Sequence, residues 1–121
     1  MRPPAGRLLR EARLTDKPQF DLVHREGLRV SDGLFAVIAR PNGLDHPRLG
    51  MAVGIRIAGN AVNRNRIRRV VRERFRLSQQ ELPPVDVVVN ARSGATGATR
   101  AQLAVSVAAL FVRMSQRCAR S

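Results

Sequence analysis

The sequence predicts a single small α/β domain, and three observations lead to that prediction. The chain has 121 residues, a length typical of one domain. Its hydrophobic content of 44% is enough for a core and excludes a disordered basic tail. Helical and strand patterns alternate along it, in the order helix, two strands, long basic helix, strand, helix. We therefore treat residues 1–121 as one domain, with 1–13 as a basic arm and about 14–117 as the folded core.

The first helix is predicted over about 16–26. Pro18 is favoured in the first turn of a helix, and Gly27 is typical of a helix end. With a period of 3.6 residues, the apolar side of this helix carries Phe20 and Val23. We expect that side to lie on the core.

Three segments have the composition of strands. Residues 34–39 form a continuous apolar run with the length of a buried strand. Residues 48–57 alternate loosely, which predicts a second strand that is broken by Gly59 and Asn60. Residues 85–91 are almost continuously apolar, which suits a central strand that is covered on both faces.

The last helix is predicted to follow Thr99, because Thr99 and Gln102 have the spacing of a capping box. Apolar residues then recur at helical spacing towards the C-terminus. They are Leu103, Val107, Leu110, Phe111 and Met114. Cys118, the single cysteine, fits this helix as a small apolar filler.

The long helix, from Ala61 to about Gln80, is divided between a basic side and an apolar side. At about 100° per residue, five Arg and one Asn share a sector about 140° wide. These residues are Arg64, Asn65, Arg68, Arg69, Arg72 and Arg76. The other side of the helix carries Ile67, Val70, Val71, Phe75 and Leu77. Arg66 and Arg74 fall at the margin of the apolar side, where their guanidinium groups would have to extend outwards to solvent.

The charge of the chain points to a polyanionic partner. The formal net charge is +13, and the cations are 21 Arg and one Lys, Lys17. A genome-wide preference for Arg codons would produce the same Arg bias, so the placement of the Arg residues carries the argument. Like charges four residues apart on one helix face destabilise it, and bound phosphates offset that repulsion. About five such contacts would give a log–log salt slope near −3.5 to −4.5. With 3% aromatic residues there is little to stack on bases, so we expect recognition of RNA shape and phosphates.

The same inventory excludes several classes of protein. The N-terminal arm has no apolar centre long enough for a secretory signal, and no apolar stretch is long enough to span a bilayer. One Cys and two His make neither an intrachain disulfide nor a zinc cluster. These features indicate a reducing, cytoplasmic setting without a membrane partner.

Other nucleic-acid functions compete with this interpretation. A protein nuclease would need clustered carboxylates for metal ions or a His pair for acid–base catalysis. The acids are instead scattered, and Asp45-His46 falls in a turn rich in Pro and Gly. A structural RNA-binding protein of the ribosomal type would carry a similar basic helix. DNA is a weaker candidate partner, because the basic helix follows a strand rather than the first helix of a helix-turn-helix.

The basic helix and its surroundings resemble the bacterial ribonuclease P protein family. The segment Asn63-Arg64-Asn65-Arg66-Ile67-Arg68-Arg69 is similar to the Arg-Asn-Arg signature of that family. Four more segments match in order and spacing, so the resemblance covers roughly 13–117, with proteobacterial members closest. They are Leu14–Phe20, Pro47–Val53, Arg74–Leu77 and Glu81–Val89.

The resemblance implies a fold and a function. The fold is a two-layer α/β sandwich with about four strands, three helices and a left-handed strand–helix–strand crossover through the basic helix, against the usual handedness. The function is that of the protein subunit of ribonuclease P, an endoribonuclease that removes the 5′ leader from precursor tRNA. In the family the RNA subunit is the catalyst and binds most of the Mg²⁺, so we expect no catalytic residue, no metal site on the protein and no cleavage by the protein alone.

The resemblance also assigns two surfaces. The positions that match the contacts to the RNA subunit are on the basic helix, and Arg76 joins them from the same sector. The full set is Arg64, Asn65, Arg66, Arg68, Arg69, Arg72 and Arg76. The leader of precursor tRNA is expected in a cleft between the first helix and the sheet. The residues expected there are Phe20, His24, Arg25, Phe35, Val37 and Arg56.

Three positions of the expected cleft depart from the family pattern. His24 stands where a second aromatic residue is usual, and Ile38 replaces a common strand aromatic. Ile55-Arg56 replaces a Lys pair and supplies one cation. These departures predict weaker binding of the leader, or binding that depends on Arg25, Arg29 and Arg56.

Overall fold

The structure is a computed structural model that describes residues 13, 14 and 16–120, with the side chains of Ile55, Arg56 and Arg120 left aside. The expected arm at 1–13 therefore lies outside the described residues except for Arg13. The elements in chain order are α1 (Lys17–Glu26), β1 (Leu28–Ser31), β2 (Phe35–Pro41), β3 (Arg48–Ala52), α2 (Ile55–Ala58), α3 (Ala61–Ser78), β4 (Val85–Ala91), a short 3-10 helix (Ser93–Ala95) and α4 (Arg100–Arg120).

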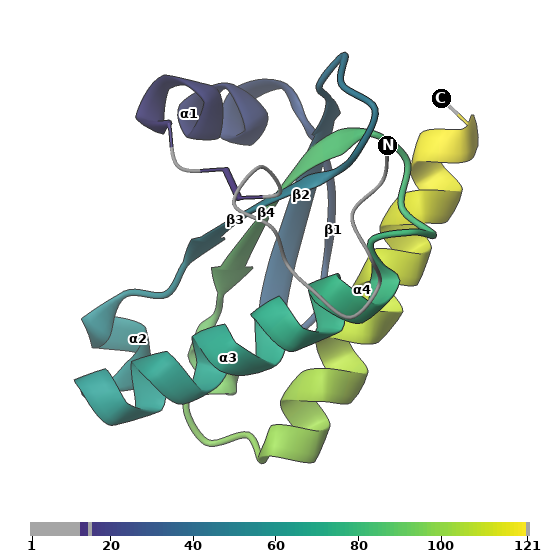
Figure 1. The fold of residues 1–121 in the computed structure, drawn as a ribbon. Coiled ribbons are helices and arrows are strands. Elements are labelled where there is room, and N and C mark those ends of the chain that lie inside the picture. Colours follow the sequence, from purple (N-terminus) through teal and green to yellow (C-terminus); the bar gives the residue numbers. More distant parts are fainter. Residues whose placement is uncertain (1–12, 15, 121) are drawn as a thin grey trace.

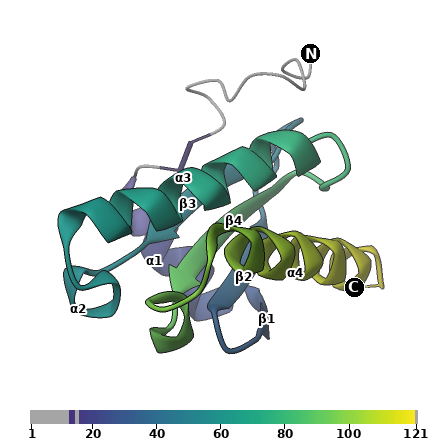
Figure 2. The ribbon, with the colours of Figure 1, turned by 90° about the horizontal axis from the view of Figure 1, so that it is seen from below.

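One four-stranded sheet, in the order β1-β2-β4-β3, divides the molecule into layers. Helix α1 lies on one face of the sheet, and α3 and α4 lie on the other (Figures 1 and 2). The larger core cluster joins α3, α4 and the inward side chains of all four strands. The smaller cluster, beneath α1, is built from Leu14, Val23, Ile38 and Val88. The sheet is thus apolar on both faces, as its continuous apolar strands predict.

The basic helix is the crossover between two parallel strands. β1 and β2 are antiparallel, as are β2 and β4, whereas β3 and β4 are parallel with Gly50 opposite Val88. Parallel neighbours need a long connection, and here it contains α2 and α3. In Figure 1, α3 lies in front of the sheet, both strands run downwards and β4 lies to the right of β3, so the crossover is left-handed. The α/β fold with three main helices and four strands is therefore confirmed.

The structure corrects three details of the predicted elements. The strand expected over 48–57 ends at Ala52, and the short helix α2 occupies the rest of that segment. A separate edge strand, β1, precedes the predicted strand at 34–39 and pairs with it as a hairpin. Leu77, placed on the apolar side of α3, is 49% exposed because it lies at the margin of the buried sector.

Candidate RNA-binding surfaces

The start of α3 is fixed by a glycine and two asparagines. Gly59 has a φ of 88°, a backbone conformation that side chains disfavour, and this turns the chain out of α2. The Asn60 side chain then accepts the backbone N–H of Asn63 at 2.8 Å, which caps the helix. Asn63 donates to the Ala58 carbonyl at 2.7 Å and accepts from Arg66 Nε at 2.8 Å. The first turn of the basic helix is therefore tied to α2.

The apolar side of α3 holds it on the sheet, so that its Arg side chains face outwards. Ile67, Val70, Val71 and Phe75 are at most 5% exposed. Phe75 meets Phe111 of α4 edge to face, with ring centroids 6.0 Å apart. Of the residues assigned to RNA, Asn65 and Arg69 are exposed, and the others, which are Arg64, Arg66, Arg68, Arg72 and Arg76, are half-buried.

Three Arg side chains converge between α3 and the edge of the sheet. The backbone of Arg13 and Leu14 runs beside β3, with Leu14 N donating to Leu49 O at 2.7 Å. This brings Arg13 next to Arg68 and Arg72, and the three line a hollow of about 180 Å³. Its other lining residues are Leu14, Leu49, Gly50 and Met51. We call this hollow the sheet-side hollow; none of its described lining residues is an acid.

The environment of Arg72 shows how crowded these cations are. Burial, followed by the charges of Arg13, Arg68 and Arg69, lowers the pKa of Arg72 from its usual value. An Arg remains protonated at neutral pH even so, because its ordinary pKa lies far above 7. The sheet-side hollow therefore keeps its positive charges close together, an arrangement that a bound anion stabilises.

The remaining Arg residues of the set differ in their partners. Arg64 has a buried Nε without a hydrogen-bond acceptor in the described part of the chain. Arg76 binds Glu73, its Nε donating to Oε2 at 3.2 Å, and this raises the pKa of Arg76. Arg76 is thus the member of the predicted set whose charge is compensated within the helix.

On the opposite face of the sheet, α1 presents one aromatic side chain. Val23 is 1% exposed and anchors the helix on Ile38 and Val88, whereas Phe20 is only partly buried. Phe20 lies over Gly50, where a Cβ would come within 2.8 Å of the Phe20 ring. The glycine therefore provides the space in which this ring rests against β3.

His24 is held between its own helix and the sheet. Its Nδ1 lies 3.1 Å from the Phe20 carbonyl oxygen, which only accepts, and its Nε2 lies 3.0 Å from Asn90 Oδ1. The rings of Phe20 and His24 are 5.0 Å apart between centroids. Asn90 was missed by the sequence reasoning; the signal is a polar residue that interrupts the apolar run of β4. Phe20, His24 and Asn90 together form what we call the α1 surface.

Two residues predicted for this surface lie elsewhere. Phe35 and Val37 are fully buried in the larger core cluster, on the face covered by α3 and α4. Because side chains alternate along a strand, Ile38 of β2 faces α1 instead. The assignment of Phe35 and Val37 to the cleft was therefore wrong. Arg25 is exposed on α1, and the side chain of Arg56 lies outside the described residues.

Comparisons with known proteins decide the family. The sequence model of the family described as Ribonuclease P matches residues 8–115. The chain belongs to the ribonuclease P protein family. It is 45% identical over 114 residues to the ribonuclease P protein component of Chromobacterium violaceum, covering 94% of this chain and 93% of the relative. It is 42% identical to that of Methylococcus capsulatus, covering 93% and 88% of the two chains. The structure of the Staphylococcus aureus RNase P protein superposes with a TM-score of 0.76 at 30% identity, covering 90% of this chain and 95% of that one.

As a ribonuclease P protein, the chain is a subunit of an endoribonuclease that processes tRNA. The expectation drawn from the Arg-Asn-Arg signature is thereby confirmed at the level of family and role. The residue assignments on α3 and α1 stay predictions, since the comparisons concern whole chains.

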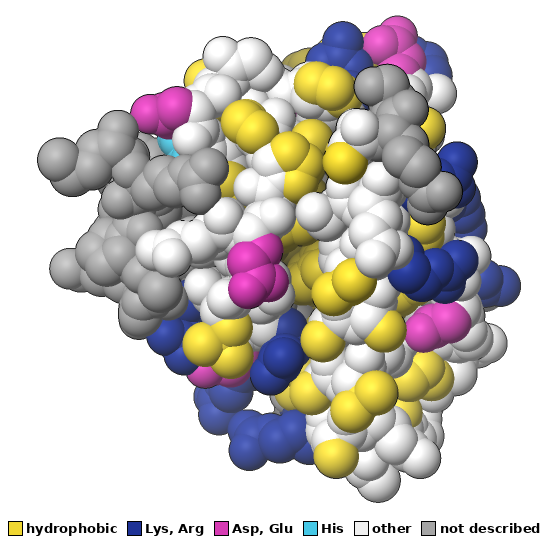
Figure 3. All heavy atoms as spheres, turned by 90° about the vertical axis from the view of Figure 1, so that its right-hand side faces the viewer, with side chains coloured by type: hydrophobic (Ala, Val, Ile, Leu, Met, Phe, Trp, Pro, Cys, Tyr) yellow, Lys and Arg dark blue, Asp and Glu magenta, His cyan; other side chains and the backbone are white. Residues whose placement is uncertain are grey.

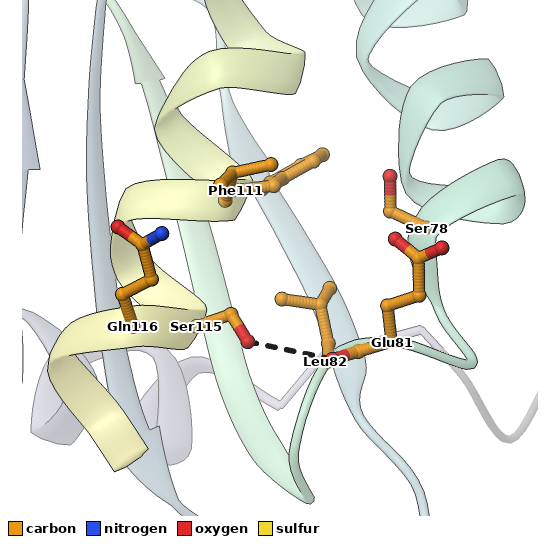
Figure 4. A pocket seen from close by; sticks show the side chains of 7 residues that line it. Ser78, Glu81, Leu82, Phe111, Ser115 and Gln116 are labelled. Carbon is orange, nitrogen blue, oxygen red and sulfur yellow. Dashed lines mark hydrogen bonds between the residues drawn. The ribbon is translucent and has the colours of Figure 1, made fainter. Parts of the chain in front are cut away.

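Two other features of this ribonuclease P protein, a hollow near the ends of α3 and α4 and the turn before β3, lie outside these basic surfaces. The hollow between the C-terminal ends of α3 and α4, about 150 Å³, has Glu81 in its lining, and none of the described lining residues is a cation (Figure 4). Ser115 Oγ donates to the Glu81 carbonyl there at 3.4 Å. In the turn before β3, the pKa of Asp45 is lowered to about 2, and the hydrogen bond with His46 is the largest cause.

Neither a metal site nor a membrane span is found in the part of the chain that the structure describes. No three of its His, Cys, Asp and Glu side chains are grouped so that they could hold a metal ion. Similarly, none of the described helices is both long and apolar enough to cross a membrane.

Proposed function

We propose that the basic side of α3 binds the RNA subunit of ribonuclease P and that the α1 surface contacts the 5′ leader of precursor tRNA. The observation that carries the first assignment is the sheet-side hollow, where Arg13, Arg68 and Arg72 meet and no described lining residue is an acid. Each guanidinium can give two parallel hydrogen bonds to a phosphate. Phosphates of a folded RNA are thus a ligand that relieves the repulsion among these cations.

The chemistry of leader removal is assigned to the RNA. Hydrolysis of a phosphodiester by a protein commonly uses carboxylates that hold metal ions, or paired acid and base groups. Among the residues that the structure describes, the acids are dispersed. Asp86 binds Arg48, with its two oxygens 2.7 Å from Nε and Nη2. Asp32 accepts from Ser106 and from two backbone N–H groups. The protein would supply binding and alignment, while Mg²⁺ held chiefly by the RNA would activate the attacking water and stabilise the leaving oxygen.

The α1 surface supports the assignment of the leader. Phe20 offers a partly exposed ring on which a base can stack, and His24 offers a second ring 5.0 Å away. Exposed Arg25 supplies a positive charge on the same helix for the leader backbone. With a single aromatic residue and one His, this surface would bind single-stranded RNA with little sequence preference. The cytoplasm, where precursor tRNA is made in bacteria, is the proposed location.

A reconstituted cleavage assay tests this function. Precursor tRNA is incubated with a bacterial ribonuclease P RNA at low Mg²⁺, with and without the protein, and with the protein alone. We expect the protein to restore cleavage by the RNA and to leave the substrate uncut by itself. Cleavage by the protein alone would contradict RNA catalysis. RNA binding without any stimulation would instead support a structural RNA-binding protein.

A further inference from the structure

Helix α3 has a second basic hollow on its other flank, facing the beginning of α4. This hollow, of about 400 Å³, is lined by Arg69, Val70, Glu73, Arg74, Arg100 and Ala104. We propose that it is a phosphate-binding subsite that takes a second stretch of RNA backbone, separate from the stretch in the sheet-side hollow. This proposal rests on the proposed RNA-binding function and extends it to a site formed by two helices. We call it the α4-side hollow.

The charges of the α4-side hollow favour an anion. Arg69 and Arg100 are exposed, one from each helix, and neither has a carboxylate partner among the ion pairs of the described residues. Glu73 is the one acid among the described lining residues, and its carboxylate accepts from Arg76. The binding of Arg76 lowers the pKa of Glu73, so the pair is ionised and close to neutral in sum at pH 7. Three Arg charges are therefore left to act on a ligand.

Arg74 provides an observation that is independent of the charge count. Its Nε is buried, with no hydrogen-bond acceptor among the described residues. A buried donor without a partner costs free energy, and that cost is recovered when the Arg74 side chain turns so that its guanidinium donates to a ligand oxygen. The sequence put Arg74 at the apolar margin of α3, and the structure shows that this margin is the wall of the hollow.

The shape of the α4-side hollow suits the sugar–phosphate backbone. Val70 and Ala104 give it an apolar part, and the small side chain of Ala104 leaves α4 open there. Its volume lies in the range of about 300–1,000 Å³ that is usual for ligand sites. In Figure 3, Lys and Arg side chains gather at the lower left, where α3 meets the beginning of α4, and a further group of them lies along the right-hand edge.

The positions of the two hollows imply two separate contacts. Arg68 and Arg72 lie on the flank of α3 towards β3, whereas Arg69 and Arg74 lie on the flank towards α4. At 100° per residue, the mean direction of Arg68 and Arg72 and the mean direction of Arg69 and Arg74 differ by roughly 150° around the helix axis. One phosphate cannot touch both flanks, so RNA backbone would pass on each side of α3. The helix would then lie between two strands of RNA.

Charge-neutralising variants of the full chain test the proposal. The probe is a bacterial ribonuclease P RNA, and its equilibrium binding is measured over a series of KCl concentrations. The variants are Arg74→Gln, Arg100→Gln and the double variant. Arg92→Gln is the matched control, since Arg92 is exposed, carries the same charge and lies outside both hollows. Arg68→Gln reports on the sheet-side hollow in the same assay.

We expect the double variant to bind at least about tenfold more weakly. The magnitude of its log–log salt slope should fall by about 0.7–0.9, the share of one phosphate. Arg92→Gln should leave the slope unchanged. When the double variant is combined with Arg68→Gln, the two decreases in the logarithm of the RNA-binding constant should add, because contacts to separate phosphates are independent. A double variant that behaves like the control would overturn the subsite, and a sub-additive combination would overturn the separate contacts.

The same data separate this inference from the proposed function. If Arg68→Gln is also without effect, the RNA-binding role of α3 fails as a whole. If Arg68→Gln weakens binding and the double variant does not, only the α4-side hollow fails. Arg100→Gln serves as the decisive single variant should Arg74→Gln lower the thermal unfolding midpoint, because Arg100 is exposed at the first residue of α4.

Discussion

Replacing Arg72 by Gln should change RNA binding and protein stability in opposite directions. Arg72 lies in the sheet-side hollow with Arg13 and Arg68, and those charges lower its pKa together with burial. In the free protein the substitution removes like-charge contacts with Arg68 and Arg69, which lie four and three residues before it on the helix, each worth about 0.2–0.5 kcal/mol. The free energy of unfolding should therefore rise by up to about 1 kcal/mol. In the complex the substitution removes a charged contact to phosphate, worth about 1.5–3 kcal/mol.

Two measurements test whether Arg72→Gln raises the stability of the free protein and lowers its affinity for RNA. Thermal unfolding of the free protein should shift upwards by up to a few degrees. Binding to ribonuclease P RNA should weaken about 10- to 150-fold, and the magnitude of the log–log salt slope should fall by about 0.7–0.9. Arg92→Gln, a loss of equal charge outside the hollow, should produce neither change. A lower unfolding midpoint with unchanged RNA affinity would refute the reasoning, since it would make Arg72 a structural residue.

Three further substitutions probe other parts of the molecule. Phe20→Ala should weaken binding of leader-bearing precursor tRNA more than that of mature tRNA, and equal losses in a competition assay would indicate a folding role for the ring. Gly27→Ala should lower the free energy of unfolding by about 1–3 kcal/mol, because the added Cβ would lie 2.6 Å from the Val23 carbonyl oxygen. Urea unfolding measures this change, and a smaller value would show that α1 can shift. Asp86→Ala should lower the free energy of unfolding by about 3–5 kcal/mol, because it leaves Arg48 without its buried partner. The folded fraction of this variant should keep its affinity for RNA. A loss of affinity in the folded protein would place the Arg48–Asp86 pair in the binding surface.

The basic helix could be predicted from the sequence in detail because its pattern is local. A period of 3.6 residues places Ile67, Val70, Val71 and Phe75 on one side, and all four are buried. The capping box at Thr99 and Gln102 is also local, and both of its hydrogen bonds are present, at 2.9 and 3.1 Å. Such features depend on neighbours within one or two turns, so tertiary structure does not alter them.

The faces of the central strands could not be predicted in the same way. Residues 34–39 are all apolar because the sheet is covered on both sides, so alternation gives no sign of which side chains face α1. That is why Phe35 and Val37 were assigned to the wrong face. The end of β3 was missed for a related reason, since the apolar alternation continues into α2 although the chain turns after Val53.

The sheet-side hollow also depends on contacts distant in sequence. Arg13 belongs to it because the backbone around Leu14 pairs with Leu49, 35 residues later along the chain. The α4-side hollow joins Arg69 to Arg100 in the same way. Net charge and helical spacing indicated a single basic face, whereas the tertiary structure shows two separate hollows on different flanks of α3.

The most direct test of this account maps both surfaces onto RNA at once. A hydroxyl-radical probe is attached to a single cysteine, introduced as Asn65→Cys on α3, His24→Cys on α1 or Gln116→Cys near the end of α4, with Cys118→Ala in each chain. In the holoenzyme with precursor tRNA, the Asn65 position should cut the RNA subunit, the His24 position should cut the 5′ leader, and the Gln116 position should cut neither strongly. Cleavage of the RNA subunit from Gln116 but not from Asn65 would contradict the central claim that α3 carries the RNA-binding surface.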